Sequence, residues 1–287
     1  MACGIILSGG LSRRFQKPDS PWIDKALYPI NGKPMIMHII DKAKEILNEL
    51  IIAVNNEDRA NRYREIIPNV KYVTDHKALT GPLAGIYSGL KACNEDHAVI
   101  LPNDTPYITP NNIELLIKYV QHFDTATYIL PNGHIVNALI ALRKDIALEI
   151  LNELSHMGRS KIFDIVRGSP KAIFLNPQTH GLDPKTLTNI NTRKDLETKN
   201  TKSKTIIKND ISIIRNFTIE DVHTRNTTKL IGSLWYTIIT KDYIPEFKLY
   251  TEAGLHDLSA HVLLDSNNEN TKTLGRLILK ALGVEKA

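Results

Sequence analysis

The residues best suited to chemistry in this chain lie in one segment near the N-terminus, residues 7–14, with the sequence LSGGLSRR. A short apolar run leads into Gly9 and Gly10, and glycine lets a backbone approach an anion closely and adopt positive φ. The two arginines that follow, together with Lys25, supply positive charge, and arginine binds phosphate oxygens through paired hydrogen bonds. A helix after the loop would direct its N-terminal amides at the same anion. The segment therefore predicts a binding site for a nucleoside triphosphate.

The spacing of this loop matches neither G-x-x-x-x-G-K-[ST] nor the three-glycine pattern of dinucleotide-binding folds. A glycine pair after a strand is also common in ordinary turns. The phosphate interpretation therefore depends on the arginine pair and on Asp24-Lys25 downstream.

A second candidate, Asp104, follows the apolar run at residues 100–102 and stands just before Pro106, which would end the strand. Mg²⁺ is usually held by one or two carboxylates together with substrate phosphates. An aspartate in this position could equally cap the following turn. Asp75 follows another expected strand, and Asn189 and Asn191 lie in a polar segment where they could bind a metal, a phosphate or only the backbone.

Apolar runs and helical periodicity alternate along the first two thirds of the chain. The expected strands are Gly4–Leu7, Leu50–Val54, Val70–Val73, Ala98–Leu101, Ala126–Leu130, Ala138–Leu142 and Ala172–Leu175, with helices such as Met35–Leu47 and Asn111–His122 between them. This alternation predicts the α/β class, with a mainly parallel, Rossmann-like sheet covered by helices on both faces. Such sheets bind ligands at the carboxyl ends of their strands, where the glycine loop would lie. Residues 81–86 (GPLAGI) are expected to form a tight turn entering a helix, with Gly85 and Gly89 allowing close packing.

The composition changes after Leu196. Residues 198–204 are polar and predict a linker, and residues 205–287 show mostly helical periodicity, with one apolar face over Leu230–Ile239. We therefore expect a catalytic domain at 1–197 and a small C-terminal helical region of unassigned function. Because all candidate site residues precede 197, a chain ending near Lys202 is expected to fold and bind the nucleotide; the alternative is that the apolar faces at Leu230–Ile239 and Leu274–Leu282 pack on the first domain.

The 287 residues carry a net charge of +5, which suits an enzyme with anionic substrates. Neither a basic block nor an aromatic-interleaved basic patch predicts nucleic-acid binding. No apolar stretch approaches the roughly 20 residues that span a bilayer, so membrane association is not expected. Cys3 and Cys93 show no disulfide or metal spacing, which favours two separate thiols, a buried Cys3 and a cytoplasmic location.

Taken together and in order, these segments resemble the MobA-like nucleotidyltransferases, over residues 1 to about 197. The resemblance implies residue roles. Leu7, Ser8, Gly9, Gly10, Arg13, Lys25, Asn55, Asp75, Gly81 and Asp104 would bind the nucleotide; Arg13, Lys25 and Asp104 would be catalytic; and Asp104 and Asn191 would hold Mg²⁺. Residues 132–137 would lie near the acceptor.

The resemblance is nearest to the guanylyltransferases of the molybdenum cofactor, and it implies transfer of GMP from GTP to the phosphate of molybdopterin. Alternatives on the same scaffold are a cytidylyltransferase of that cofactor, a guanylyltransferase for a cobamide precursor and a sugar-phosphate nucleotidyltransferase. A different class is a non-catalytic GTP-binding protein that recruits a protein partner through its C-terminal helices. Asn103, where the family commonly has cysteine, and the long segment between Arg14 and Asp24 depart from the family pattern.

Overall fold

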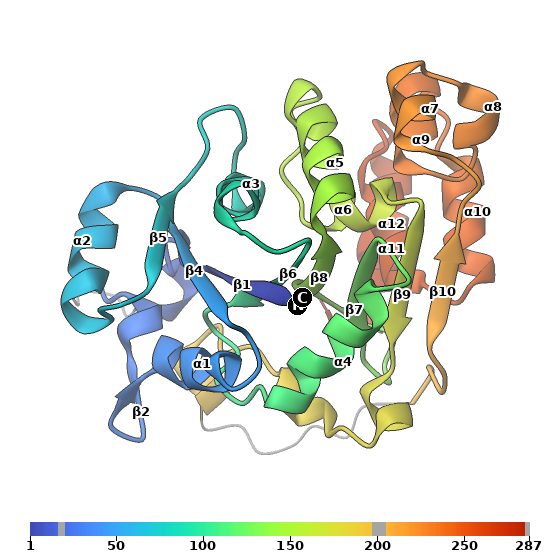
Figure 1. Cartoon of the computed structure of the whole chain (residues 1–287). Helices are drawn as coiled ribbons and strands as arrows, with labels where there is room; N and C mark the ends of the chain where they lie inside the picture. Colours follow the sequence, from blue (N-terminus) through green and yellow to red (C-terminus); the bar gives the residue numbers. More distant parts are fainter. Residues whose placement is uncertain (17–20, 197–204, 285–287) are drawn as a thin grey trace.

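The computed structural model describes residues 1–16, 21–196 and 205–284 and is built around one eight-stranded sheet (Figure 1). The strands of this sheet are β1 (Ala2–Leu7), β4 (Glu49–Val54), β5 (Lys71–Thr74), β6 (His97–Pro102), β7 (Thr125–Ile129), β8 (Ile135–Arg143), β9 (Lys171–Leu175) and β10 (Ile211–Ile214). Their order is β10-β9-β7-β8-β6-β1-β4-β5. A small ribbon of β2 (Pro29–Ile30) and β3 (Lys33–Pro34) lies apart from it. All seven expected strands are present, and the α/β class is confirmed.

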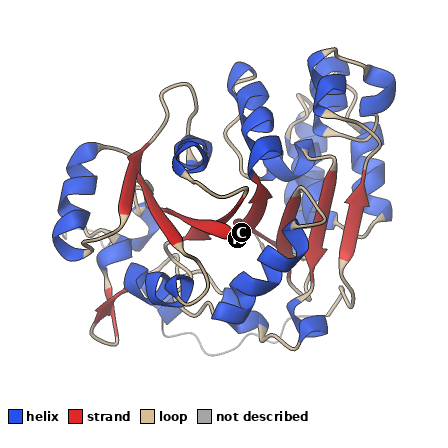
Figure 2. Ribbon diagram, viewed as in Figure 1, coloured by secondary structure: helices blue, strands red, loops and turns tan. Residues whose placement is uncertain are grey.

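Helices cover both faces of the sheet (Figure 2). On one face lie α1 (Met35–Lys44), α2 (Glu57–Ile66) and α4 (Pro110–Val120), and on the other lie α3 (Pro82–Ala92), α5 (Lys144–His156) and α6 (Phe163–Gly168). Side chains of a strand alternate between faces. In β1, Ile5 therefore packs in the core beneath α3, whereas Ile6 packs in the core beneath α1. Gly89 of α3 permits close packing as expected, because a Cβ there would lie 2.5 Å from the Ile5 side chain.

The strands are mainly parallel around β1, which pairs in parallel with β4 and β6. Two strands run the other way: β8 is antiparallel to both β6 and β7, and β10 is antiparallel to β9. The connection from β7 to β8 is a short turn around Gly133, whose φ is +86°, and a turn of this length can join only antiparallel strands.

The C-terminal region is mostly helical, as expected, and also contributes a strand, β10. Its helices are α7 (Ile219–His223), α8 (Thr227–Leu230), α9 (Leu234–Thr240), α10 (Ile244–Glu252), α11 (His256–Leu264) and α12 (Glu269–Ala281). The expected apolar face over Leu230–Ile239 is divided between α8 and α9, because Gly232 between them adopts φ +77°. Trp235 and Leu258 belong to the same hydrophobic core as Ile150.

The expected division at residue 197 stays a prediction, and the linker at 198–204 lies outside the described residues.

Three-residue and four-residue 3-10 turns complete the described chain: η1 (Arg13–Phe15), η2 (Lys25–Leu27), η3 (Pro177–His180), η4 (Pro184–Leu187) and η5 (Arg193–Leu196). Across the described ranges, no helix has both the length and the apolar character needed to cross a membrane.

The two cysteines form a disulfide, so the expectation of two separate thiols was wrong. Cys3 is the second residue of β1 and Cys93 caps the end of α3, and the packing of α3 against β1 brings together two residues that are 90 positions apart. Spacing along the chain carries no sign of this contact, because it arises only when strand and helix pack. The expected burial of Cys3 is confirmed, and Cys93 is buried with it.

Candidate active site

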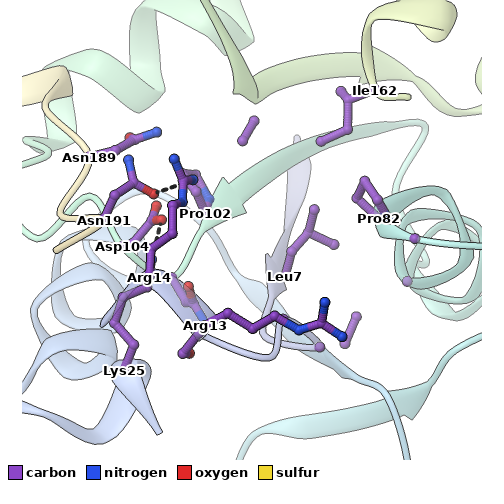
Figure 3. A pocket seen from close by; sticks show the side chains of 18 of the residues that line it. Leu7, Arg13, Arg14, Lys25, Pro82, Pro102, Asp104, Ile162, Asn189 and Asn191 are labelled. Carbon is purple, nitrogen blue, oxygen red and sulfur yellow. Dashed lines mark hydrogen bonds and ion pairs between the residues drawn. The ribbon is translucent and has the colours of Figure 1, made fainter. Parts of the chain in front are cut away.

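A cavity of about 460 Å³ opens at the carboxyl ends of β1 and β6, where the sequence places the glycine loop. Its lining residues come from the ends of strands, the loop after β1, the start of α3 and the segment before η5 (Figure 3). They are Leu7, Gly9, Gly10, Ser12, Arg13, Arg14, Lys25, Ala53, Asp75, Gly81, Pro82, Gly85, Pro102, Asn103, Asp104, Ala138, Ile162, Asn189 and Asn191.

The glycine loop differs from its expected conformation in two respects. Neither Gly9 nor Gly10 adopts positive φ; the left-handed residue is Ser12, with φ 51°. The loop continues into the short 3-10 turn η1 rather than a helix, so helical amides are not what faces an anion here. Gly10 has no neighbouring atom within 4 Å of where a Cβ would stand, and its missing side chain leaves the cavity open. Close approach of the backbone, rather than unusual φ, explains glycine at this position.

Lys25 and Asp104 form an ion pair inside the cavity, with 2.7 Å between Lys25 Nζ and Asp104 Oδ2. Both side chains are largely shielded from solvent, with exposed fractions of 11% and 16%. The second carboxylate oxygen, Asp104 Oδ1, is buried and has no hydrogen-bond partner among the described residues. A buried carboxylate oxygen without a partner is costly unless a cation or donor completes the site.

The polar segment at residues 189–191, just before η5, closes this side of the cavity. The backbone N–H of Ile190 donates to the carbonyl oxygen of Asp104 over 2.7 Å, which fixes the neighbouring asparagines beside the carboxylate. Thr105 Oγ1 donates to Asn189 Oδ1 over 2.7 Å, and Arg14 Nη2 donates to Asn191 Oδ1 over 3.1 Å. Two amides and two cations therefore surround the Asp104 carboxylate (Figure 3).

The side of the cavity away from Asp104 carries the apolar side chains of Leu7, Pro82 and Ile162, and the Arg13 side chain extends toward this side (Figure 3). The cavity thus combines a charged half around Lys25 and Asp104, which suits phosphates, with a mainly apolar half, which suits a flat organic ring. The tight turn expected at residues 81–86 is present: Gly81 adopts φ +62° and Pro82 begins α3.

Asp75 lines the cavity just after β5, with its carboxylate beside Gly9 and Gly85. Its backbone N–H donates to the carbonyl of Val54 over 3.0 Å, and Gly85 leaves room beside it, since a Cβ at that glycine would stand 3.2 Å from Asp75 Oδ1. Burial raises the pKa of the Asp75 carboxyl above its usual value, and the Arg59 charge offsets part of that rise. A carboxyl that is only partly desolvated and lines a cavity is suited to accept hydrogen bonds from a ligand.

The structure brings together most of the residues selected from the sequence. Those lining the cavity are Leu7, Gly9, Gly10, Arg13, Lys25, Asp75, Gly81, Asp104 and Asn191. Ser8 does not line it; this residue is fully buried beneath the loop and bonds to Tyr63. Asn55 is exposed at the end of β4, beside Gly9, and is also not a lining residue. Residues 132–137 are likewise absent from the lining, although Ala138 directly after them is present.

Several lining residues were not among the selected sites. Arg14 was expected to supply positive charge to the phosphates but was not given a role of its own, and Asn103 adjoins the selected Asp104. Ala138 and Ile162 had none, because an apolar side chain that lines a cavity looks in sequence like one that fills a core.

Comparison with known proteins agrees with this geometry. A MobA-like NTP transferase domain matches residues 4–171, which is more than half of the chain. The chain belongs to the MobA-like NTP transferase family. Within the matched range lie the glycine loop, Lys25 and Asp104, so the residues that line the charged half of the cavity fall largely inside the family domain.

Relatives of this MobA-like protein carry consistent names at modest identity. The molybdenum cofactor guanylyltransferase of Shewanella putrefaciens is 28% identical over 159 residues, covering 55% of this chain and 77% of that protein. The probable molybdenum cofactor guanylyltransferase of Pyrococcus horikoshii is 27% identical over 203 residues, covering 67% of this chain and 95% of that protein.

Solved structures show the same fold. The molybdopterin-guanine dinucleotide biosynthesis protein A of Archaeoglobus fulgidus aligns with a TM-score of 0.57 at 20% identity, covering 68% of this chain and 95% of its own. The 4-diphosphocytidyl-2C-methyl-D-erythritol synthase of Anaerococcus prevotii aligns with a TM-score of 0.53 at 13% identity, covering 68% and 92%. Together the family and the fold identify the chain as a nucleotidyltransferase.

Proposed function

We propose that this MobA-like protein transfers GMP from GTP to the terminal phosphate of molybdopterin and releases pyrophosphate. One observation carries the proposal: a single cavity unites the glycine loop, the cations Arg13 and Lys25, and a carboxylate, Asp104, that has one unpartnered oxygen. The names of the relatives support GTP and the pterin as substrates, and the apolar half of the cavity gives the guanine ring a place.

The residues around Asp104 fit a Mg²⁺ ion. Asp104 Oδ1 is buried and has no partner among the described residues, and Asn191, whose Oδ1 accepts from Arg14 in this structure, lines the same cavity. Hard cations prefer oxygen ligands of these kinds. When bound, Mg²⁺ would draw charge from the phosphate oxygens of the substrate and so make the phosphorus more electrophilic.

The protein's own side chains would bind and position the reactants. A terminal phosphate oxygen of the acceptor would attack the α-phosphorus of GTP, and the bond from that phosphorus to the bridging oxygen would break, so that pyrophosphate leaves with the bonding electrons. Arg13 and Lys25 would neutralise the negative charge that builds up on the leaving group. No general base is needed, because the acceptor phosphate is already ionised at neutral pH. Holding the two substrates in line would account for much of the rate.

A nucleotide-by-acceptor panel tests the proposal. Pyrophosphate release would be measured with GTP, CTP and UTP against molybdopterin, a cobamide-precursor phosphate and sugar phosphates, all with Mg²⁺. We expect turnover with GTP and molybdopterin only. Turnover with CTP, or with another acceptor, would instead support one of the related transferases, and binding of GTP without turnover on any acceptor would support a non-catalytic GTP-binding protein.

A pair of lysine variants provides the matched control. Lys25→Ala should abolish most of the turnover, whereas Lys91→Ala, at an exposed position near the far end of α3, should leave it unchanged. Equal activity of the two variants would contradict the assigned role of Lys25.

A further inference from the structure

A buried ion pair, Arg59 with Asp24, lies directly beneath the glycine loop. Arg59 Nε and Nη2 both donate to Asp24 Oδ2, over 3.0 and 2.7 Å, and Arg59 is only 3% exposed. Neither residue lines the cavity. The sequence analysis included Asp24 in the phosphate-binding pattern only as the neighbour of Lys25 and did not name Arg59, so the site as described gives the pair no role of its own.

Each partner of the pair holds one half of the proposed phosphate site. Arg59 uses its remaining nitrogen, Nη1, to donate to the carbonyl oxygen of Gly10 over 2.9 Å. Asp24 uses its other oxygen, Oδ1, to accept the N–H of Ala26 over 3.1 Å, and so caps the turn η2 on which Lys25 stands. One ion pair therefore fixes both the loop backbone and the lysine that reaches Asp104.

The bond to Gly10 has an electrostatic consequence. A carbonyl oxygen carries partial negative charge and would repel a phosphate if it faced the cavity. Because Gly10's carbonyl is bound to Arg59, which lies outside the cavity, that oxygen is directed away from the space that an anion would occupy. The guanidinium can make this third bond while holding Asp24 because its donors form a rigid planar fork.

Neighbouring side chains hold the pair in place. Tyr63 donates to Asp24 Oδ2 over 2.9 Å and shares a 2.8 Å hydrogen bond with Ser8, which in turn accepts from Asn103 over 2.8 Å. Burial and the Asp24 charge raise the pKa of the Tyr63 hydroxyl well above its usual value, so it stays protonated and able to donate. This chain of bonds connects the end of β6 to α2 beneath the loop.

We propose that Arg59 and Asp24 are positioning residues for the triphosphate, which together orient the Gly10 backbone and Lys25 toward the phosphates. The inference rests on the proposed function in that the anion is taken to be a nucleoside triphosphate. Buried ion pairs contribute little net stability on average, since desolvation offsets their attraction. What distinguishes this pair is that both of its spare hydrogen-bonding groups hold parts of one anion site.

The decisive variant is Arg59→Lys, because lysine keeps the charge opposite Asp24 but cannot bond to two groups through a fixed fork. Its matched control is Arg215→Lys: Arg215 is also buried and also donates to backbone carbonyls, those of Ser169 and Gly232, but at the β10 side of the sheet. Affinities for GTP, guanosine and inorganic triphosphate would be measured by calorimetry, and amide hydrogen exchange would be followed over residues 9–14.

We expect Arg59→Lys to weaken binding of GTP and of inorganic triphosphate by about tenfold, a loss of about 1.4 kcal/mol, and to leave guanosine binding within about twofold. Exchange over residues 9–14 should accelerate. Arg215→Lys should change none of these. Wild-type affinity for triphosphate in Arg59→Lys, or an equal loss for guanosine, or the same loss in Arg215→Lys, would overturn the proposal.

A second variant keeps the test valid if a single substitution unfolds the protein. The double variant Asp24→Asn/Arg59→Gln removes both charges together and avoids leaving one of them buried alone. The double variant should show a cooperative thermal unfolding transition, and its affinity for triphosphate should fall while its affinity for guanosine stays the same. Unchanged triphosphate affinity in a folded double variant would overturn the inference. Triphosphate binding by a wild-type protein that shows no turnover with any acceptor would reject the proposed function alone, and absence of triphosphate binding would reject both.

Discussion

Lys25 Nζ donates to Asp104 Oδ2 over 2.7 Å, and the other oxygen of the same carboxylate is buried and finds no partner in the described part of the chain. The two residues are 79 positions apart, yet both are held firmly: Lys25 stands on a capped turn, and the backbone of Asp104 accepts from Ile190. The ion pair therefore orients the carboxylate and leaves one oxygen for a cation. We therefore expect substitution of Asp104 to cause the largest fall in turnover.

Asp104→Asn should reduce Mg²⁺-dependent pyrophosphate release by at least about a hundredfold, because the amide keeps the size of the side chain but loses the charge that holds a cation. A Mg²⁺ titration of the initial rate measures the effect, and circular dichroism checks the fold. Asp58→Asn, at an exposed position of α2, is the control. Near-wild-type turnover in Asp104→Asn would remove Asp104 from the metal site.

Gly10→Ala should lower the affinity for GTP without lowering the stability of the folded protein. The φ of Gly10 is not positive and no atom lies within 4 Å of a Cβ placed there, so alanine fits the unliganded protein. The same methyl group would project into space that the phosphates need. We expect an unchanged melting temperature and a loss of GTP affinity of about tenfold or more. Full GTP affinity in this variant would show that the triphosphate does not approach Gly10.

Much of this site could be predicted from the sequence because strand ends and loop residues are local signals. The apolar run before Gly9 marks where β1 stops, and parallel strands bring such points to one edge. Pro106 does not mark the end of its strand as expected, because β6 already ends at Pro102, two residues before Asp104. The backbone conformation of the loop was harder to predict from the sequence, because the residue with left-handed φ is Ser12 rather than a glycine.

Features that depend on packing between distant segments could not be predicted. The Cys3–Cys93 disulfide forms because α3 lies against β1, and nothing in the local sequence of either cysteine records that contact. The Arg59 contact with Gly10 joins residues 49 positions apart, and an arginine in an otherwise polar helix resembles a solvated residue. Ile211–Ile214 was too short an apolar run to separate from its helical surroundings.

The raised pKa of Asp75 leads to a pH-dependent effect on stability. Because burial raises its pKa in the folded protein, the folded state favours the protonated carboxyl, and the stabilisation it gives below the unfolded pKa is lost as the pH rises through the folded pKa. Asp75→Asn should therefore melt higher than wild type at pH 7, with the difference shrinking toward pH 4. Guanosine affinity should fall in the same variant. Equal melting curves across this range would contradict the desolvation argument.

Reduction of the Cys3–Cys93 disulfide should lower the free energy of unfolding but leave the arrangement of the residues around the cavity unchanged. Closing a loop of 90 residues removes entropy from the unfolded chain, equivalent to about 4–5 kcal/mol in the chain-entropy model. We expect the Cys3→Ser/Cys93→Ser variant to unfold at lower denaturant concentration with a similar GTP affinity. Titration of two free thiols in the unreduced, denatured wild-type protein would show that the bond does not form.

The C-terminal region offers the test of the domain division. A truncated variant ending at residue 204 would lose β10, which pairs with β9, and the Trp235 indole, which is fully buried and donates to the carbonyl of Gly168 over 2.8 Å. It would also lose Glu246, which accepts two hydrogen bonds from the buried Arg167.

Removing these partners exposes an apolar patch, and the loss of Asp265 together with Glu246 leaves Arg167 with only Asp164 of its three carboxylates; both changes favour aggregation or unfolding. Contrary to the expectation from the sequence, we therefore expect the truncated variant to be insoluble or to melt well below the full chain, with GTP giving it little stabilisation. Thermal unfolding of both proteins with and without GTP measures this, because a ligand that binds only the native state raises its stability. A soluble fragment that GTP stabilises as much as the full chain would instead establish residues 1–197 as an independent domain.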